Sequence, residues 1–407
     1  MIKDADEFVE SIKLLGKLEK KLVDYIDCDD FHEISFFQKF DATFNKMNIK
    51  ENYDLYEVFI RLLCRISLSR PSLKTSHKKI VHVISTLISD YEMLEVFHVA
   101  EIFNTFKNNR SILLHLFKQN IITARMLCQE VYNTHNTYFF LFFYPEIQHV
   151  DPKLFTKMTK KFNNVALTIK KYDDSLDLFF KKRDVGHSED EVAEIIRNDD
   201  IDQFTNLLER SLVGINSKIF PSIFESNSDI NSYFNGGASL LEYSMIFGSI
   251  NIFKYLLLHQ AVFNQKSYRY AIIGGSNEII HILEDDNRFK FDKECLIKSI
   301  GCHYFDITYY LKSSLSLSLS KDEEFINDIE SLNFYQFSEF IKTSDELVKI
   351  VDLFPDSFVN YLIYITELFF LKFLLRQDHM DINTNIIYFI YLQLSTWFLT
   401  WSNMPHL

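Results

Sequence analysis

The stretch Ser239–Leu257 reads SLLEYSMIFGSINIFKYLL, and its pattern returns twice further along the chain. The second copy, at residues 270–283, reads YAIIGGSNEIIHIL, and the third, at residues 299–311, reads SIGCHYFDITYYL. Self-similarity at a fixed period of a few tens of residues is typical of stacked-repeat proteins, in which each unit buries its apolar face against the next. The pattern therefore predicts a solenoid with a binding surface, and it does not identify what is bound.

The spacing of the three copies is nearly constant. Gly248 and Gly275 lie 27 residues apart, and His303 follows Gly275 by 28 residues. The same steps separate two sets of apolar residues, namely Ile252, Ile279 and Ile307, and Leu256, Leu283 and Leu311. An earlier, weaker copy begins at Glu191. Residues 209–238, which are rich in Asn, Ser and Gly, are predicted to form an insertion loop between it and the copy at Ser239–Leu257.

The composition indicates a helical protein in a reducing compartment. The 407 residues include 40 Phe and 21 Tyr but only 9 Gly and 6 Pro, so residues that break helices are scarce. The five cysteines are an odd number and form no CxxC pair, which favours free, buried thiols. The N-terminus is acidic and lacks the apolar core of a secretion signal, so we expect a cytoplasmic protein.

The net charge of −13 comes entirely from the second half of the chain. Residues 1–190 hold 27 basic and 27 acidic side chains, whereas residues 191–407 hold 16 basic and 29 acidic ones. An acidic module disfavours nucleic acids and anionic lipids as partners, because both are polyanions. We therefore expect no nucleic-acid partner.

The expected fold class is all-α, with a helical N-terminal domain followed by a degenerate ankyrin-type α-solenoid. Apolar residues recur at helical spacing through residues 1–185, and ankyrin-like repeats are expected over residues 186–312. A Ser-rich linker at 313–324 is expected to separate these from degenerate ankyrin-like repeats at 325–407. The last copies end without a polar capping repeat, as they would in a truncated or frame-shifted coding sequence.

The segment at residues 239–264 resembles the ankyrin repeat. Ser239 stands at the consensus Thr, Leu241 at a consensus Leu and Gly248 at the glycine between the two helices. The segment His259–Asn264 is similar to the terminal Gly-Ala-Asp-Val-Asn of the consensus. Glu242 replaces the consensus His, and the period is shorter than the usual ~33 residues.

The chain also resembles a large family of ankyrin-like proteins, with a domain of unknown function, that is expanded in parabasalid protists. The resemblance covers about residues 1–312 and resumes at 371–383. It rests on motifs that occur in a fixed order, namely IFNTFKNNRSILL at 102–114, YPEI at 144–147, FPSIFE at 220–225, LEY at 241–243 and FGS at 247–249. It implies an ankyrin-type solenoid behind a helical domain, and it implies no activity.

Signatures of catalysis are missing from the sequence. It contains no Gly-rich phosphate loop, no HExxH, no GxSxG and no paired Cys/His metal spacing. Cys295 and Cys302 occupy positions expected in the core of the repeats, and the histidines of residues 1–180 are scattered. We therefore predict that the protein is not an enzyme and holds no cofactor and no metal.

The apolar segment 386–401 leaves one alternative open. It has no charged residue, but it is shorter than the ~20 residues that a membrane-spanning helix needs, and it contains Gln, Ser and Thr. A buried helix of the repeats is the preferred interpretation. The alternative is a tail-anchored or peripheral membrane protein that uses this segment.

The favoured function is a non-enzymatic scaffold or adaptor that binds another protein. In ankyrin stacks the first helix of each repeat lines a concave face, and aromatic side chains dominate many interfaces. Mapping the consensus onto this chain predicts six partner-binding residues on that face, namely Tyr243, Ile246, Phe247, Tyr270, Ile273 and Lys298. The competing interpretation is that Ile246 and Phe247 only pack against the neighbouring repeat. The sequence specifies neither the partner nor the oligomeric state.

Overall fold

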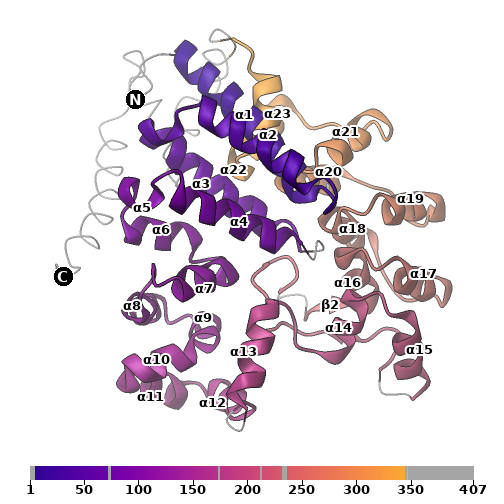
Figure 1. Ribbon diagram of the computed structural model, residues 1–407. Coiled ribbons are helices and arrows are strands. Elements are labelled where there is room, and N and C mark those ends of the chain that lie inside the picture. The colour runs from indigo at the N-terminus through magenta and orange to yellow at the C-terminus, as the bar shows by residue number, and fades with distance from the viewer. Residues whose placement is uncertain are drawn as a thin grey trace, which may run out of the picture. The chain divides into compact units, whose positions relative to one another are not determined.

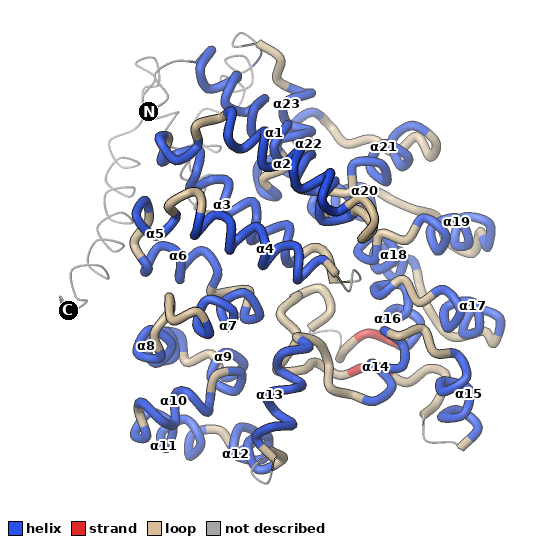
Figure 2. The backbone as a smooth tube through the Cα atoms, in the orientation of Figure 1, coloured by secondary structure: helices blue, strands red, loops and turns tan. Residues whose placement is uncertain are grey.

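The computed structural model describes residues 5–71, 75–172, 175–210, 213–231 and 236–343, together with Glu346. These residues form helices joined by short turns almost throughout, as Figure 1 and Figure 2 show. The strands in the described residues are one antiparallel pair, β1 (Lys218–Ile219) and β2 (Ala238–Ser239). The described part of the chain is therefore all-α, as predicted.

Thirteen α-helices precede the repeated sequence in the described residues, and ten follow from Glu191 onward. The first group comprises α1 (Ala5–Asp27), α2 (Glu33–Lys46), α3 (Tyr53–Leu68), α4 (Ser76–Ser89), α5 (Met93–Val96), α6 (Val99–Phe106), α7 (Arg110–Lys118), α8 (Ala124–Thr134), α9 (Thr137–Phe142), α10 (Tyr144–Val150), α11 (Pro152–Lys161), α12 (Asn163–Lys170) and α13 (Leu176–Val185). The second comprises α14 (Glu191–Arg197), α15 (Ile201–Glu209), α16 (Leu240–Phe247), α17 (Ile250–Leu258), α18 (Tyr268–Gly274), α19 (Asn277–Asp286), α20 (Lys293–Gly301), α21 (Phe305–Ser313), α22 (Lys321–Ser331) and α23 (Phe334–Phe340).

The chain divides into two compact units. One combines the residues up to Phe59 with those from Ser320 onward, and the other runs from Ile60 to Leu319. The predicted division between residues 185 and 186 falls inside the second unit, between α13 and α14, and it stays a prediction.

In the first unit, α1 packs against both α2 and α23. Phe8, Leu15 and Leu22 lie on the buried face of α1, because the helix is amphipathic and these residues recur at helical spacing. The buried carboxylate of Glu19 accepts a hydrogen bond from the backbone N–H of Tyr335, at 2.8 Å. The first N–H groups of a helix have no hydrogen-bond partner within it. Glu19 therefore supplies an acceptor for one N–H group at the start of α23, although the two residues are 316 positions apart in the sequence.

In the second unit, four helix pairs carry the repeated sequence: α14/α15, α16/α17, α18/α19 and α20/α21. Each pair turns through a residue in the left-handed region, namely Asp199 (φ 51°), Gly248 (64°), Gly275 (66°) and His303 (55°). The first helices α14, α16, α18 and α20 contact one another in that order, and so do the second helices α15, α17 and α19. Figure 1 shows the two resulting columns of helices. The steps of 27 and 28 residues therefore mark successive turns between paired helices.

The apolar residues that share these steps form the interior of the second helices. All six are buried, namely Ile252, Ile279, Ile307, Leu256, Leu283 and Leu311. Polar contacts also join successive pairs. The carboxylate of Asp199 accepts hydrogen bonds from the backbone N–H groups of Asn251 (3.1 Å) and Ile252 (3.0 Å). The turn of the first pair thereby satisfies two N–H groups at the start of α17.

The two predicted loop segments contain little regular structure where they are described. Residues 213–231 and 236–238 hold no helix, and β1 and β2 tie the two ends of the insertion together. Residues 315–320 also lack helix, with half-buried Leu and exposed Ser in alternation. The ends of the predicted Ser-rich linker, 313–324, overlap the neighbouring helices, because α21 includes Ser313 and α22 begins at Lys321.

No helix of the described part of the chain is both long enough and apolar enough to cross a membrane. The apolar segment 386–401 and the repeat-like stretch 371–383 lie outside the described residues. The interpretations attached to them stay predictions.

Gly274→Ala is expected to lower the free energy of unfolding by about 1–3 kcal/mol, the usual range for overpacking. A Cβ at this position would collide with the carbonyl oxygen of Met245 on α16, and backbone atoms cannot move aside as a flexible side chain can. Gly301 is the matched control, since it also ends a first helix but has no atom within 4 Å of an added Cβ. Gly301→Ala should be neutral or stabilise by up to about 1 kcal/mol. Urea unfolding followed by circular dichroism measures both, and equal effects would contradict the close approach of α16 and α18.

Candidate interaction surface

The structure places five of the six predicted partner-binding side chains in the interior. Those that are buried, with at most 9% of their surface exposed, are Tyr243, Ile246, Phe247, Tyr270 and Ile273. Lys298 is the exception, because 28% of its side chain is exposed. Five of the six therefore do not lie on an open face in this structure, and their role in partner binding stays a prediction. They pack within one apolar cluster shared by successive helix pairs, as the competing interpretation for Ile246 and Phe247 held.

Three of these six residues occupy equivalent positions in successive pairs. Tyr243, Tyr270 and Lys298 each lie five residues before the left-handed turn residue of their pair (243 and 248, 270 and 275, 298 and 303). Their polar ends all have partners: the phenols accept hydrogen bonds from arginines, and the ammonium group of Lys298 forms an ion pair. The first helices thus carry a row of polar contacts on one side.

Arg197 and Tyr243 make the first of these contacts. A terminal nitrogen of the Arg197 guanidinium donates to the phenol oxygen of Tyr243 at 2.8 Å, and the guanidinium lies 5.9 Å from the ring centre of Phe247. Burial raises the pKa of Tyr243, although the nearby positive charge of Arg197 acts in the opposite direction. Tyr243 therefore stays protonated at neutral pH.

Arg269 and Tyr270 make the second contact. The guanidinium of Arg269 donates to the phenol oxygen of Tyr270 at 3.0 Å and lies over its ring at 4.9 Å. Burial by itself would lower the pKa of Arg269, but the Tyr270 hydroxyl and the carboxylates of Asp229 and Glu242 outweigh it and raise that pKa. The Nε atom of Arg269 is buried and has no hydrogen-bond partner among the described residues.

Lys298 makes the third contact, with a segment of the insertion. Its ammonium group lies 2.9 and 3.0 Å from the two carboxylate oxygens of Asp229. Asp229 belongs to residues 222–231, which we call the covering segment. This segment is closed on itself, because the side-chain amide of Asn231 donates to the carbonyl oxygens of Ser222 (2.9 Å) and Glu225 (3.0 Å).

The covering segment also reaches α16. The carboxylate of Glu225 is almost completely buried, and one of its oxygens lies 2.9 Å from Nδ1 of His187. The ring of His187 contacts that of Phe247 edge-on, with 5.1 Å between the ring centres. On its other side, the segment inserts Phe224 among the rings of Phe142, Tyr172 and Phe179.

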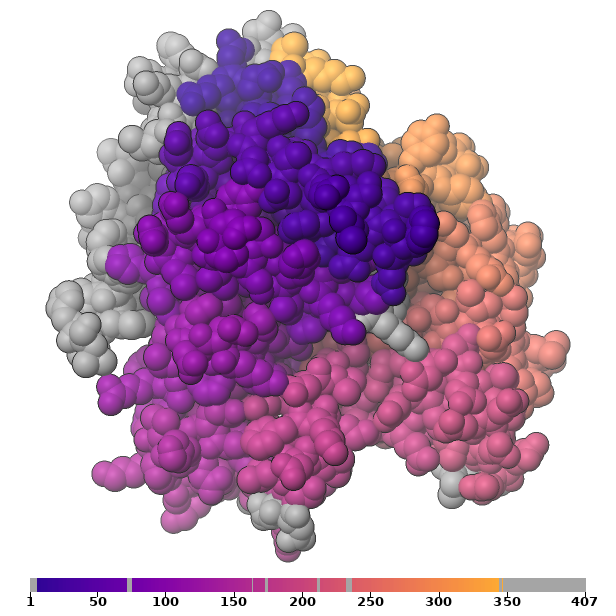
Figure 3. All heavy atoms as spheres, viewed as in Figure 1, coloured from indigo at the N-terminus to yellow at the C-terminus, as the bar shows by residue number. Residues whose placement is uncertain are grey.

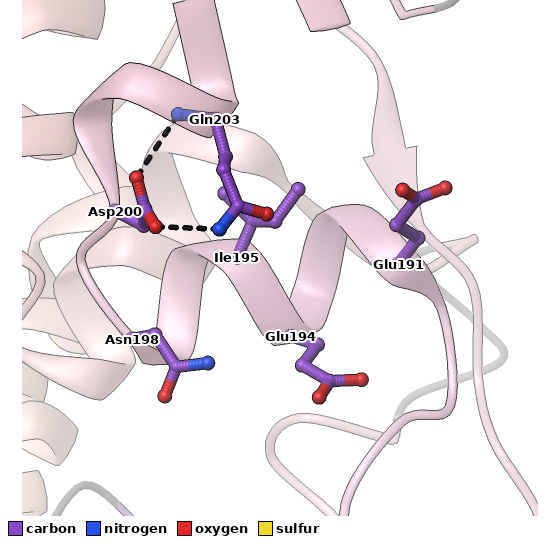
Figure 4. A pocket seen from close by; sticks show the side chains of 6 residues that line it. All are labelled: Glu191, Glu194, Ile195, Asn198, Asp200 and Gln203. Carbon is purple, nitrogen blue, oxygen red and sulfur yellow. Dashed lines mark hydrogen bonds between the residues drawn. The ribbon is translucent and has the colours of Figure 1, made fainter.

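A small acidic hollow lies at the start of the helix stack. It has a volume of about 180 Å³. Figure 4 shows its lining on α14, on α15 and in the turn between them, namely Glu191, Glu194, Ile195, Asn198, Asp200 and Gln203. Asp200 accepts hydrogen bonds from the backbone N–H (3.0 Å) and the side-chain amide (2.7 Å) of Gln203. These two contacts cap the start of α15. Glu194 is paired with Lys182 at 3.0 Å, so two of the three carboxylates of the hollow already have partners.

The thiols of the described residues show no sign of activation. Cys64, Cys128, Cys295 and Cys302 are buried, and Cys28 is half-buried. Burial raises the pKa of Cys128 and Cys302 to about 11, and that of Cys64 and Cys295 to about 12. Such thiols are almost fully protonated at neutral pH, so they are poor nucleophiles. No group of three or more His, Cys, Asp or Glu side chains within the described ranges could hold a metal ion.

Sequence reasoning missed Arg197, Arg269 and Asp229. The two arginines lie two and six residues before their turn residues (197 and 199, 269 and 275), so they do not share the step of the repeat. Asp229 lies in the insertion, which has no counterpart in the other pairs. The available signal was composition alone, since Arg197 and Arg269 are among the few basic residues of an acidic half.

Comparisons of this chain with protein-family models, with curated proteins and with solved structures find no match.

Proposed function

We propose that the protein is a cytoplasmic, non-enzymatic adaptor that binds another protein through an ankyrin-type stack of helix pairs. The observation that supports this best is the regular succession of left-handed turns at Gly248, Gly275 and His303, each between two short helices. Units of this kind bury their apolar faces against their neighbours and leave extended outer surfaces for partners. The excess of acidic residues in this half of the chain favours a protein over a nucleic acid as the partner.

The outer side of the stack offers apolar side chains for such a partner. Leu258, at the end of α17, is 79% exposed, and Val262, in the loop that follows, is 71% exposed. In the space-filling view of Figure 3, the salmon to orange atoms of residues 250–313 form a surface at the right of the picture. Large apolar side chains exposed near one another are typical of binding sites, although single ones are common on any surface.

Replacing Leu258 and Val262 together is expected to weaken binding at least tenfold, or about 1.4 kcal/mol. The partner would be identified by co-purification with the tagged full-length chain, and the affinity of the purified pair measured by calorimetry. Leu258→Ser with Val262→Ser is the test variant. Leu167→Ser is the control, because Leu167 is 70% exposed but lies on α12, outside the stack. Unchanged affinity would exclude this loop as the contact, and the absence of any co-purifying protein that binds the purified chain would contradict the adaptor function.

A further inference from the structure

Cationic side chains gather on one side of the first helices, although this half of the chain is acidic. Arg197 lies on α14, Arg269 on α18 and Lys298 on α20, whereas residues 191–407 as a whole hold 16 basic and 29 acidic side chains. Two of these cations also donate hydrogen bonds to tyrosines of the first helices: Arg197 to Tyr243 on α16, and Arg269 to Tyr270 on α18. The result is a mixed basic and aromatic surface, which we call the first-helix face.

The covering segment supplies acidic groups that match this face. Asp229 forms the ion pair with Lys298, and its negative charge also contributes to the raised pKa of Arg269. The negative charge of Glu225 likewise contributes to the raised pKa of Tyr243. Asp229 thus pairs with Lys298 of α20 and lies near Arg269 of α18, and Glu225, four residues earlier, lies near Tyr243 of α16.

The covering segment contacts the stack as a bound peptide would, through an apolar anchor and an ion pair at the margin. Ile230 is an apolar anchor, being 6% exposed and part of the apolar cluster of the stack. The ion pair between Asp229 and Lys298 lies at the margin, where the two side chains are 34% and 28% exposed. A competing carboxylate can therefore reach Lys298 from solvent before the buried contacts are broken.

We propose that the first-helix face is a peptide-binding surface occupied here by the chain's own covering segment, and that its partner is an extended acidic peptide that displaces this segment. The proposal rests on the adaptor function and adds a second binding face, separate from Leu258 and Val262, together with the chemistry of its partner. Because the segment is tethered, it competes at an effective concentration on the order of millimolar. A partner must therefore bind more tightly than the segment does, or bind after the segment has been released.

The test uses the full-length chain and a fluorescein-labelled peptide of residues 220–231, FPSIFESNSDIN, as the probe. Asp229→Lys places a second cation against Lys298 and should release the covering segment, residues 222–231. Hydrogen exchange of these residues should then accelerate at least tenfold, while α16, α18 and α20 keep their protection. The probe should bind this variant at least tenfold more tightly than the wild type, by fluorescence anisotropy. Lys298→Gln removes the ion pair without repulsion, so it should also accelerate hydrogen exchange of the segment, with a smaller effect. It should not improve probe binding, because it also removes the cation that Asp229 of the probe contacts.

The double variant Asp229→Lys with Lys298→Asp is the control, because it restores the ion pair in reversed order. It should return both hydrogen exchange and probe binding to wild-type values. A probe in which Glu225 and Asp229 are replaced by Gln and Asn should bind the released variant at least tenfold more weakly. The proposal is overturned if Asp229→Lys binds the probe no better than the wild type, or if α14–α21 lose protection together with the segment. Neither outcome affects the adaptor function, whose test depends on Leu258, Val262 and a co-purified protein.

Discussion

Arg183→Ala is expected to lower the free energy of unfolding by about 3–5 kcal/mol, because it leaves a largely buried carboxylate without its cation. The guanidinium of Arg183 donates two hydrogen bonds to the two carboxylate oxygens of Glu146, at 2.8 and 2.9 Å. A third goes to the carbonyl oxygen of Phe142 at 3.0 Å. The Arg183 and Glu146 side chains are only 4% and 13% exposed, so water cannot replace the lost contacts.

The surroundings of Arg183 add to this effect. Its guanidinium lies 5.0–6.0 Å from the ring centres of four phenylalanines, namely Phe142, Phe143, Phe179 and Phe180. A cation over an aromatic ring contributes about 0.5–2 kcal/mol, depending on how far it is removed from water. Truncation to Ala also leaves an empty volume among these rings, which a close-packed interior cannot fill without rearrangement.

Lys182→Ala is the matched control for Arg183→Ala. Lys182 is the preceding residue on α13, and it forms an ion pair with Glu194 at 3.0 Å between side chains that are 29% and 53% exposed. Pairs so accessible to water contribute about 0–1 kcal/mol. Guanidinium unfolding followed by circular dichroism at 222 nm measures both variants. Similar losses of stability would show that the buried pair of Arg183 and Glu146 has no special role.

The second large effect is expected at Leu283, where truncation to Ala should cost about 2–5 kcal/mol. Leu283 is completely buried in α19, which packs against α17 and α18. Because stacked helix pairs stabilise one another, the loss should spread to the neighbouring pair. Hydrogen exchange should therefore accelerate in residues 239–264 as well as in α19.

Glu278→Ala is the control for Leu283→Ala on the same helix. Glu278 is 51% exposed and forms an ion pair with Lys254 at 2.6 Å, between side chains that both remain in contact with water. Its removal should change the stability by no more than about 0.5 kcal/mol. If Glu278→Ala destabilises the protein as much as Leu283→Ala does, the alignment of the helix pairs used here is incorrect.

The turns and the buried residues of the helix pairs could be predicted from the sequence because they depend on neighbours along the chain. Gly248 and Gly275 have no Cβ and so adopt positive φ without strain, and His303 belongs to the few other residue types found there more often. The leucines at 256, 283 and 311 recur with the same steps and are all buried. A periodic pattern of this kind is readable without knowledge of any distant contact.

The surroundings of the predicted partner-binding residues could not be predicted in this way. Tyr243 and Tyr270 occupy the positions expected of partner-binding residues, yet the structure buries them. What surrounds them comes from far along the chain: Asp229 pairs with Lys298, 69 residues away, and the carbonyl oxygen of Glu225 accepts a hydrogen bond from Arg110, 115 residues away. No local pattern encodes such pairs, since they depend on how separate surfaces fit together.

The helical class, the turns between paired helices and the buried side of each second helix could thus be predicted from local sequence patterns. The contact of the insertion with the first helices could not, and neither could the hydrogen bond between Tyr335 and Glu19, 316 residues apart, that joins α23 to α1. The difference lies in the range of the interactions. Helix periodicity and turn conformation arise from residues a few positions apart, whereas packing depends on the shape and charge of whole faces that meet only in the folded chain.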